Sequence, residues 1–326
     1  MRALVLEDHQ GPGSLELRDI PAPEPGEGEV RVQVRAVGLN RADLLQTLGR
    51  YPGPPMEHEV PGLEYSGVVE KLGAGADPDL AGQPVCGILG AGAYAEQIVT
   101  AAELLLPIPA GLSFEQAAAI PEAFLTAYDA LHNRGHVQRG ETVLVHAAAS
   151  GVGIAALQLA RLAGAKTVAT LRSASKVEAI QAWLDQPPLV LSEPKFADAV
   201  RERTSGRGAD VILDFIGAAY LEENLRALAP RGRQIVIGLM GGAGAKLDLA
   251  RLLTQRLRIE GTVLRSRPLA EKIELTRAFR PALAGFVDGR LAAVVDSIFP
   301  FDQAAPALER MAANLNTGKL ILSLTE

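Results

Sequence analysis

The sequence is poor in sulfur, with one cysteine, Cys86, among its 326 residues. A lone thiol excludes an internal disulfide and any structural zinc site built from several thiolates. We therefore expect a protein of a reducing compartment, most simply the cytoplasm. We interpret Cys86 as an inert core residue.

Positive charge and aromatic side chains are also scarce. The chain has 32 Lys and Arg against 38 Asp and Glu, a net charge of −6, and only 4% aromatic residues. This balance argues against a broad nucleic-acid surface, and no aromatic and basic cluster suggests binding of single-stranded RNA. The apolar fraction of 48% is that of an ordinary globular protein, and the length allows two domains.

Long hydrophobic runs are missing, apart from the uncharged residues 142–160, TVLVHAAASGVGIAALQLA. This run is close to the length of a membrane-spanning helix. Its middle, however, consists of small residues and includes Gly151 and Gly153, and the chain has no second comparable run. We expect a strand, a turn and a helix here, and no membrane association.

The first 120 residues predict short strands separated by turns. Residues 29–36 alternate apolar and polar side chains, the pattern of a half-buried strand. Proline and glycine in residues 21–26 and 51–55 predict turns. Ser113, followed by the acidic Glu115, predicts the start of a helix.

From residue 141 the pattern changes to short apolar strands that alternate with amphipathic helices. The predicted strands are residues 142–146, 167–171, 189–191, 211–216, 234–239 and 259–264. The predicted helices are residues 152–163, 175–184, 196–204, 220–228 and 247–253. This alternation predicts an α/β fold with a doubly wound parallel sheet.

The alternation stops after Arg265. We expect helices at residues 269–286 and 303–314 and a final strand that begins at Lys319. This tail is too short to bury a core alone, so we expect it to complete the first domain. The parallel-sheet domain is then an insertion.

The turn at residues 148–153, AASGVG, matches the third glycine of the dinucleotide fingerprint Gly-x-Gly-x-x-Gly. Small residues at the other positions still permit close approach, and a helix that begins after the turn directs its N–H groups at a phosphate. The candidate phosphate-binding residues are Ser150, Gly151, Val152 and Gly153. A turn that serves packing alone is the alternative.

The end of the second predicted strand indicates which dinucleotide binds. It carries Arg172, Ser173 and Lys176 and no carboxylate before Glu178. Cationic and hydroxyl donors suit a 2′-phosphate, whereas an acidic residue would bind the free ribose of NADH. This pattern predicts that the domain binds NADPH. The alternative is that these residues only cap a helix and carry solvated surface charges.

A glycine-rich turn follows the fifth predicted strand. Gly238, Leu239 and Met240 begin it, at the edge of the sheet where ligands bind in open α/β folds. We expect these residues near the nicotinamide half of the cofactor, with a flexible connector as the alternative.

The chain resembles the medium-chain dehydrogenase/reductase superfamily, and within it the zinc-independent, zeta-crystallin-like quinone oxidoreductases of the tumour-suppressor-inducible type. The segments that carry this resemblance are residues 37–46, 61–67, 120–128, 149–153, 238–242 and 264–267. The resemblance implies a mainly β, GroES-like catalytic domain of residues 1–121 and 266–326. It also implies a Rossmann domain of residues 122–265, bound NADPH and a homodimer.

Zinc-dependent members of this superfamily carry a cysteine at the position of Asn40 and a histidine at the position of Leu63. Neither residue here replaces a thiolate or an imidazole as a zinc ligand. His132 and His136 are spaced for a metal helix, but no glutamate follows the first histidine. We expect no metal.

The resemblance also implies roles for individual residues. It places Asn40 and Tyr51 at the substrate pocket, where Tyr51 would orient the acceptor or supply a proton, and Thr126 near the nicotinamide. A purely structural Tyr51 is the alternative. The resemblance also assigns Leu264, Arg265 and Ser266 to the binding of the cofactor, with Lys319 as a weaker candidate.

Together these features favour an NADPH-dependent quinone oxidoreductase without zinc. A quinone accepts hydride directly because its conjugated oxygen takes the developing charge. The alternatives are a reductase of 2-alkenals, other enones or enoyl thioesters, and a non-catalytic, NADPH-binding structural or regulatory protein.

Overall fold

The structure is a computed structural model that describes residues 1–51 and 53–324. Pro52, in the predicted turn after Tyr51, and residues 325–326 lie outside the described residues. The chain divides into two compact units, of which unit 1 comprises Met1–Leu125 and Arg265–Glu326, and unit 2 comprises Thr126–Leu264. Helix α3 (Pro121–Tyr128) contains the first boundary.

Unit 2 contains a parallel six-stranded sheet in the order β10-β9-β8-β11-β12-β13. Its strands are β8 (Thr142–Val145), β9 (Lys166–Leu171), β10 (Leu189–Val190), β11 (Ala209–Asp214), β12 (Leu228–Val236) and β13 (Arg258–Gly261). The direction in which strands are added reverses between β8 and β11, which defines the switch point of a doubly wound sheet. The predicted fold class is confirmed.

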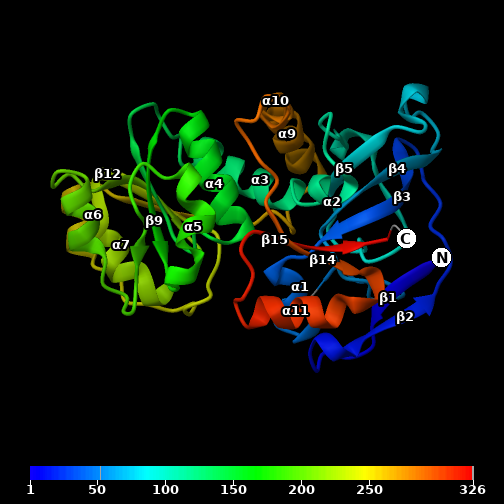
Figure 1. Cartoon of the computed structure of the whole chain (residues 1–326), viewed down its shortest axis with the longest axis horizontal. Coiled ribbons are helices and arrows are strands. Elements are labelled where there is room, and N and C mark those ends of the chain that lie inside the picture. The colour runs from blue at the N-terminus through cyan, green and yellow to red at the C-terminus, as the bar shows by residue number, and fades with distance from the viewer. Residues whose placement is uncertain (52, 325–326) are drawn as a thin grey trace. The chain divides into compact units, whose positions relative to one another are not determined.

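Helices cover both faces of this sheet, as Figure 1 shows for the green and yellow part of the chain. They are α4 (Gly151–Leu162), α5 (Val177–Ile180), α6 (Ala197–Arg203), α7 (Leu221–Ala227) and α8 (Leu249–Gln255). Helix α4 packs on β8 and β9, and α7 and α8 pack on β12. The central strands β8 and β11 are buried along their whole length, which explains why they are mainly apolar, whereas the edge strands β10 and β13 are not fully buried.

Two predicted helices are interrupted by 3-10 turns. The predicted helix at residues 175–184 has only the single α-turn α5, between tighter 3-10 turns. Its end is held by β9, because the Thr167 hydroxyl donates to the Trp183 carbonyl at 3.2 Å. The predicted helix at residues 269–286 is helical throughout but is not one α-helix: a 3-10 turn, Arg280–Leu283, separates α9 (Leu269–Phe279) from α10 (Ala284–Val287), because Pro281 lacks the N–H that would continue α9.

Unit 1 is mainly β structure. Its larger sheet has the order β14-β15-β3-β4-β5-β7, with β6 also paired to β3, and a second sheet joins β1 to β2. The strands are β1 (Arg2–Leu6), β2 (Leu15–Asp19), β3 (Glu29–Gly38), β4 (Glu64–Leu72), β5 (Pro84–Ile88), β6 (Gln97–Ala101), β7 (Leu106–Pro107), β14 (Val295–Pro300) and β15 (Lys319–Ser323). Strand β15 pairs antiparallel with β3, so the C-terminal tail completes this unit.

The helices of unit 1, besides the first part of α3, are α1 (Arg41–Thr47), α2 (Phe114–Ala117), α9 (Leu269–Phe279), α10 (Ala284–Val287) and α11 (Ala304–Ala312). Ser113 caps α2 as predicted, since its hydroxyl accepts from the Gln116 N–H. Helix α1 was missed within the predicted β region. Its start is stabilised by Asp43, whose carboxylate accepts from the Asn40 N–H at 2.7 Å.

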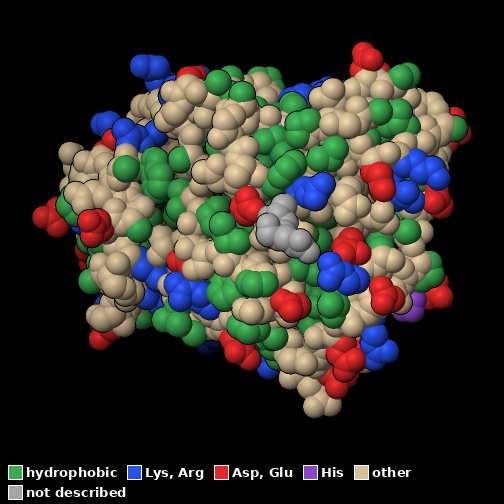
Figure 2. All heavy atoms as spheres, turned by 45° about the vertical axis from the view of Figure 1, so that its right-hand side comes forward, with side chains coloured by type: hydrophobic (Ala, Val, Ile, Leu, Met, Phe, Trp, Pro, Cys, Tyr) green, Lys and Arg blue, Asp and Glu red, His purple; other side chains and the backbone are tan. Residues whose placement is uncertain are grey.

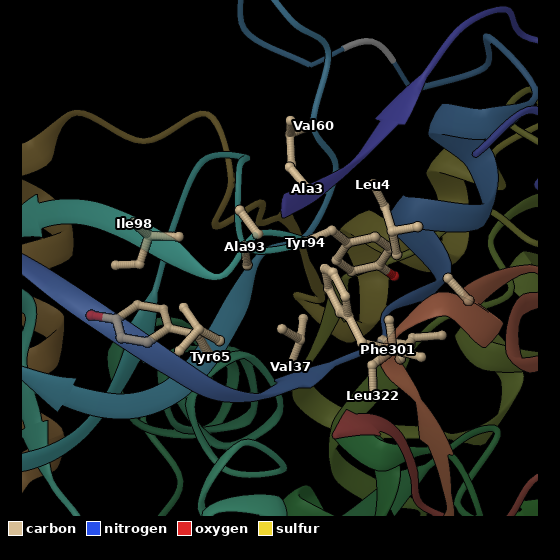
Figure 3. Packing of buried hydrophobic residues seen from close by; sticks show 14 of the residues in the cluster. Ala3, Leu4, Val37, Val60, Tyr65, Ala93, Tyr94, Ile98, Phe301 and Leu322 are labelled. Atoms are coloured by element: carbon tan, nitrogen blue, oxygen red, sulfur yellow. The ribbon is translucent and has the colours of Figure 1, made fainter. Parts of the chain in front are cut away.

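The core of unit 1 contains two buried tyrosines with opposite hydrogen bonding. Figure 3 shows Tyr65 and Tyr94 among the aliphatic side chains of this cluster. The Tyr94 hydroxyl donates to the Asp43 carboxylate at 3.1 Å. The Tyr65 hydroxyl is buried and has no hydrogen-bond partner among the described residues.

The surface carries both signs of charge. On the face in Figure 2, Lys and Arg side chains lie close to Asp and Glu side chains. Among the helices of the described residues, none is long and apolar enough to cross a lipid bilayer.

The two tyrosines predict different responses to the same substitution. Tyr94→Phe removes the hydroxyl that donates to buried Asp43, so we expect the free energy of unfolding to fall by about 1–3 kcal/mol. Tyr65→Phe is the matched control, and it should be neutral or stabilising because its hydroxyl is buried without a partner. Urea unfolding of both variants measures this, and equal losses would contradict the assignment.

Candidate active site

In unit 2, the turn between β8 and α4 has the form of a phosphate-binding loop. The Ser150 hydroxyl caps α4 by accepting from the Gly153 N–H at 3.1 Å. The first-turn N–H groups of α4 have no partner within the helix and carry its positive dipole end. A Cβ on Gly153 would lie 2.6 Å from the Ala147 carbonyl oxygen, so only glycine permits this approach. The loop therefore fits a dinucleotide phosphate.

A buried polar network holds the base of this loop. The Asn224 side-chain amide donates to Asp214, so its oxygen accepts from Nε2 of His146 at 2.7 Å. Nδ1 of His146 is then the acceptor for the Thr170 hydroxyl at 2.8 Å. Burial lowers the pKa of His146, which keeps the ring neutral. His146, the residue before the loop, is thereby fixed to β9 and α7, and the sequence pattern did not reveal this role.

The predicted specificity residues follow β9. Arg172 is exposed, Lys176 is partly buried, and the Ser173 hydroxyl hydrogen-bonds the Ser175 hydroxyl at 2.7 Å. Because β8, β9 and β12 are parallel, their carboxyl ends lie along one edge of the sheet. The phosphate loop and Arg172 thus lie at the same edge as Gly238.

The turn after β12 presents apolar side chains. Leu239 and Met240 are 54% and 49% exposed. Their backbone rests on the turn after β11, since the Met240 N–H donates to the Phe215 carbonyl at 3.2 Å. Thr126 is partly buried on α3, and Leu264 is buried at the end of unit 2.

In unit 1, the Glu64 carboxylate joins three separate segments. One oxygen, Oε1, accepts from Lys319 Nζ at 2.5 Å and from Asn40 Nδ2 at 2.9 Å. The other, Oε2, accepts from the backbone N–H of Glu122 at 2.8 Å. Glu64 thereby links β4 to the β15 strand, to the turn before α1 and to the first turn of α3.

This arrangement requires glycine at the end of β3. A Cβ on Gly38 would lie 2.5 Å from Oε1 of Glu64 and 2.4 Å from the Ala118 carbonyl oxygen. The missing side chain lets the carboxylate reach Asn40, whose amide also donates to the Gly38 carbonyl at 3.2 Å.

Lys319 is enclosed within this cluster. It is only 5% exposed, and besides Glu64 its ammonium donates to the Leu39 carbonyl at 2.6 Å and to Asn40 Oδ1 at 2.8 Å. An ammonium has three N–H donors, and these three acceptors use them all. Both ends of the Asn40 amide are therefore fixed.

A second cation, Arg265, holds the segment that carries Tyr51. Its guanidinium lies over the Tyr51 ring, 5.0 Å from the centroid, and donates to the Tyr51 carbonyl at 3.2 Å. It also donates to Gln46 Oε1 at 2.6 Å and to the Gly90 carbonyl at 2.8 Å. Ser266, by contrast, is exposed.

Glu122 and Lys272 lie near Tyr51 and Arg265, and neither residue was predicted from the sequence as part of the site. Burial is the main cause that raises the pKa of Tyr51, and the nearby charge of Glu122 raises it further. Burial lowers the pKa of Lys272, whose ammonium donates to the Arg265 carbonyl at 2.7 Å. A carboxylate directly after a helix-starting proline, in the apolar segment 117–128, was the signal available in the sequence.

A metal site needs several ligating side chains close together. In the part of the chain that the structure describes, no three His, Cys, Asp or Glu side chains are placed to hold a metal ion. Leu63, at the position where zinc-dependent enzymes carry a histidine, is buried and apolar.

Both units match known family models. Residues 26–110 match the alcohol dehydrogenase GroES-like domain, and residues 151–279 match the zinc-binding dehydrogenase domain. The human synaptic vesicle membrane protein VAT-1 homolog is 30% identical over 99% of this chain and 86% of its own.

Solved structures extend the comparison. An NAD-dependent alcohol dehydrogenase shares 33% identity with a TM-score of 0.89, covering all of both chains. A mycobacterial protein complexed with NADPH shares 30% identity with a TM-score of 0.89, covering 99% of this chain and 100% of its own. A mycobacterial quinone oxidoreductase shares 30% identity with a TM-score of 0.84, covering 99% of this chain and 99% of its own. The JamJ enoyl reductase shares 27% identity with a TM-score of 0.88, covering 99% of this chain and 98% of its own.

These matches cover nearly the whole chain and both of its units. The GroES-like catalytic domain and the Rossmann domain are those of one enzyme family, whose members named above are mostly oxidoreductases. The chain belongs to the medium-chain dehydrogenase/reductase superfamily.

Proposed function

We propose that the protein is an NADPH-dependent quinone oxidoreductase that works without zinc, of the zeta-crystallin-like, tumour-suppressor-inducible type. The observation that carries this proposal is the cluster of Glu64, Asn40 and Lys319, a buried ion pair that also binds an amide. The Lys319 ammonium neutralises Glu64 there. The similarity to a mycobacterial quinone oxidoreductase supports the same reaction.

The residues of unit 1 would bind and polarise the acceptor. When bound, NADPH supplies the hydride. Tyr51, held by the guanidinium of Arg265, is a phenol donor for the acceptor oxygen, because its raised pKa keeps it protonated. Asn40 has its amide fixed by Glu64 and Lys319, so it would limit where the acceptor can lie. Thr126 would lie beside the nicotinamide.

The residues of unit 2 would bind the cofactor. The N–H groups of Gly151 and Val152 at the start of α4, with Ser150 and Gly153, suit the pyrophosphate. The donors of Arg172, Ser173 and Lys176 suit a 2′-phosphate, and a relative in complex with NADPH supports that choice.

Other predicted cofactor residues divide into two groups. Gly238, Leu239, Met240, Leu264 and Ser266 remain proposed contacts of the cofactor. Arg265 and Lys319 are engaged within unit 1, so we propose that they act indirectly, through Tyr51 and Asn40 respectively.

We further propose a cytoplasmic homodimer. Strand β13 is an edge of its sheet, and Leu249 and Leu253 on the nearby α8 are 66% and 77% exposed. Apolar exposure of this kind next to an open sheet edge favours association with a second copy.

Reduction of an enone or an enoyl thioester is the second candidate. The JamJ enoyl reductase has the same fold, and conjugated carbonyl groups accept hydride in the same way. The residues assigned above would serve either acceptor.

The test of the proposed function is oxidation of NADPH, under aerobic and anaerobic conditions, with a panel of quinones, 2-alkenals and enoyl thioesters. We expect turnover with quinones to exceed turnover with the other acceptors. Faster turnover with enones would favour the second candidate. Tight NADPH binding without turnover of any acceptor would contradict the enzyme and favour a structural or regulatory role.

The cofactor assignment predicts a selective loss of affinity. In the Arg172→Ala/Lys176→Ala double variant, we expect the Kd for NADPH to rise by more than tenfold while the Kd for NADH changes little. Calorimetric titration measures both constants. Lys166→Ala, at the opposite end of β9, is the matched control, and equal losses for the two cofactors would refute the 2′-phosphate site.

A further inference from the structure

Glu122 carries a carboxyl group to which the proposed function assigns no role. It lies in the first turn of α3, and its backbone N–H donates to Glu64 Oε2 at 2.8 Å. The backbone of Glu122 is therefore anchored to the Glu64 cluster. No hydrogen bond to its carboxyl oxygens is found within the described residues. The backbone of Glu122 is thus held in place, while its carboxyl group is not consumed by a structural hydrogen bond.

The surroundings of Glu122 favour the neutral acid. Burial is the main cause that raises its pKa, to about 8, and the negative charges of Glu64 and Asp43 raise it further. The positive charges of Lys319 and Lys272 act in the opposite direction. At neutral pH the carboxyl group therefore retains its proton.

Glu122 also shares the neighbourhood of Tyr51. When it is ionised, Glu122 raises the pKa of both the Tyr51 phenol and the Lys272 ammonium. Lys272 donates to the backbone carbonyl of Arg265, the residue whose guanidinium covers the Tyr51 ring. Through the two oxygens of Glu64, the Glu122 backbone is also joined to Asn40, which the proposed function places at the acceptor. Glu122 therefore lies at the proposed site.

We propose that Glu122 is the catalytic acid that donates the proton to the reduced acceptor, and that Lys272 tunes its charge. This inference rests on the proposed function, because it assigns a step of that reaction. Of the groups in this pocket, a carboxyl group that is protonated at neutral pH and ionises just above it is the best matched general acid.

The proton and electron balance is simple. Hydride adds two electrons and one hydrogen to the conjugated acceptor, and the negative charge appears on its carbonyl oxygen. The O–H bond of Glu122 breaks, a new O–H bond forms on that oxygen, and the electron pair stays on the Glu122 carboxylate. Water from the solvent returns a proton to Glu122 before the next turnover.

Tyr51 and Lys272 are weaker candidates for this step. The pKa of Tyr51 is raised further above its usual value of 10, so the phenol gives up its proton less readily than Glu122. One N–H of the Lys272 ammonium donates to the Arg265 carbonyl, and a Lys272→Met variant separates Lys272 from Glu122 as the acid. Tyr51 can still hydrogen-bond the acceptor oxygen without losing its proton.

The pH profile of kcat tests the assignment. In the wild type, kcat should fall as pH rises above about 8, because Glu122 loses its proton. In Glu122→Gln we expect this alkaline limb to disappear and kcat at pH 7 to fall by about 100-fold or more. Glu27→Gln, an exposed carboxyl group, is the matched control and should behave as the wild type.

Two further variants separate a catalytic role from a structural one. Lys272→Met removes a positive charge that lowers the pKa of Glu122, so the alkaline limb should move to higher pH. Tyr51→Phe should lower kcat but keep the limb at its wild-type position. An alkaline limb that persists in Glu122→Gln, or that vanishes in Tyr51→Phe, would overturn the proposal.

A measurement without substrate keeps the two proposals distinct. The infrared carbonyl band of a protonated carboxyl group, present in the wild type and absent in Glu122→Gln, should persist to a pH of about 8. Loss of that band below pH 6 would overturn the role of Glu122. If the wild type turns over no acceptor at all, the proposed function fails, whatever this titration shows.

Stability should follow the same titration. Because folding raises the pKa of Glu122 from 4.5 to about 8, this group stabilises the fold fully below pH 4.5 and loses that contribution as pH rises to 8. Relative to the wild type, Glu122→Gln should therefore become more stable over this window. A stability difference that does not change with pH would contradict the raised pKa.

Discussion

The catalytic unit depends on one buried carboxylate, that of Glu64. Through its two oxygens it joins the last strand of the chain, the turn before α1 and the start of α3. These segments are far apart in the sequence, and a buried carboxylate without such partners would strongly destabilise the fold. The positions of Asn40 and Glu122 therefore follow from how Glu64 is neutralised.

A lysine neutralises Glu64, and this has a chemical consequence. An ammonium with all three N–H groups engaged is a fixed positive charge, and it offers no open coordination position to a substrate. In the proposed function, such a site would polarise an acceptor through hydrogen bonds and supply protons from its own side chains. Its neutral carboxyl group, Glu122, is consistent with that chemistry, because desolvation near Glu64 keeps its proton bound.

The sequence predicted what depends on local pattern. The alternation of strands and helices after residue 141 predicted the doubly wound sheet, and the small residues 148–153 predicted the turn that precedes α4. It could not predict contacts between distant segments, such as those of Lys319 with Leu39 and Asn40. Helix α1 was missed because its start depends on Asp43, a single side chain within a region of strand-like pattern.

The measurement that tests this account most directly is a double-mutant cycle on Lys319 and Glu64, read as free energy of unfolding. Lys319→Met alone should cost about 3–5 kcal/mol, because it leaves a buried carboxylate without its counter-ion. Adding Glu64→Gln should recover much of that loss, so the two effects should differ from additivity by more than about 1 kcal/mol. Strictly additive losses would show that Lys319 does not neutralise Glu64, and would contradict the account.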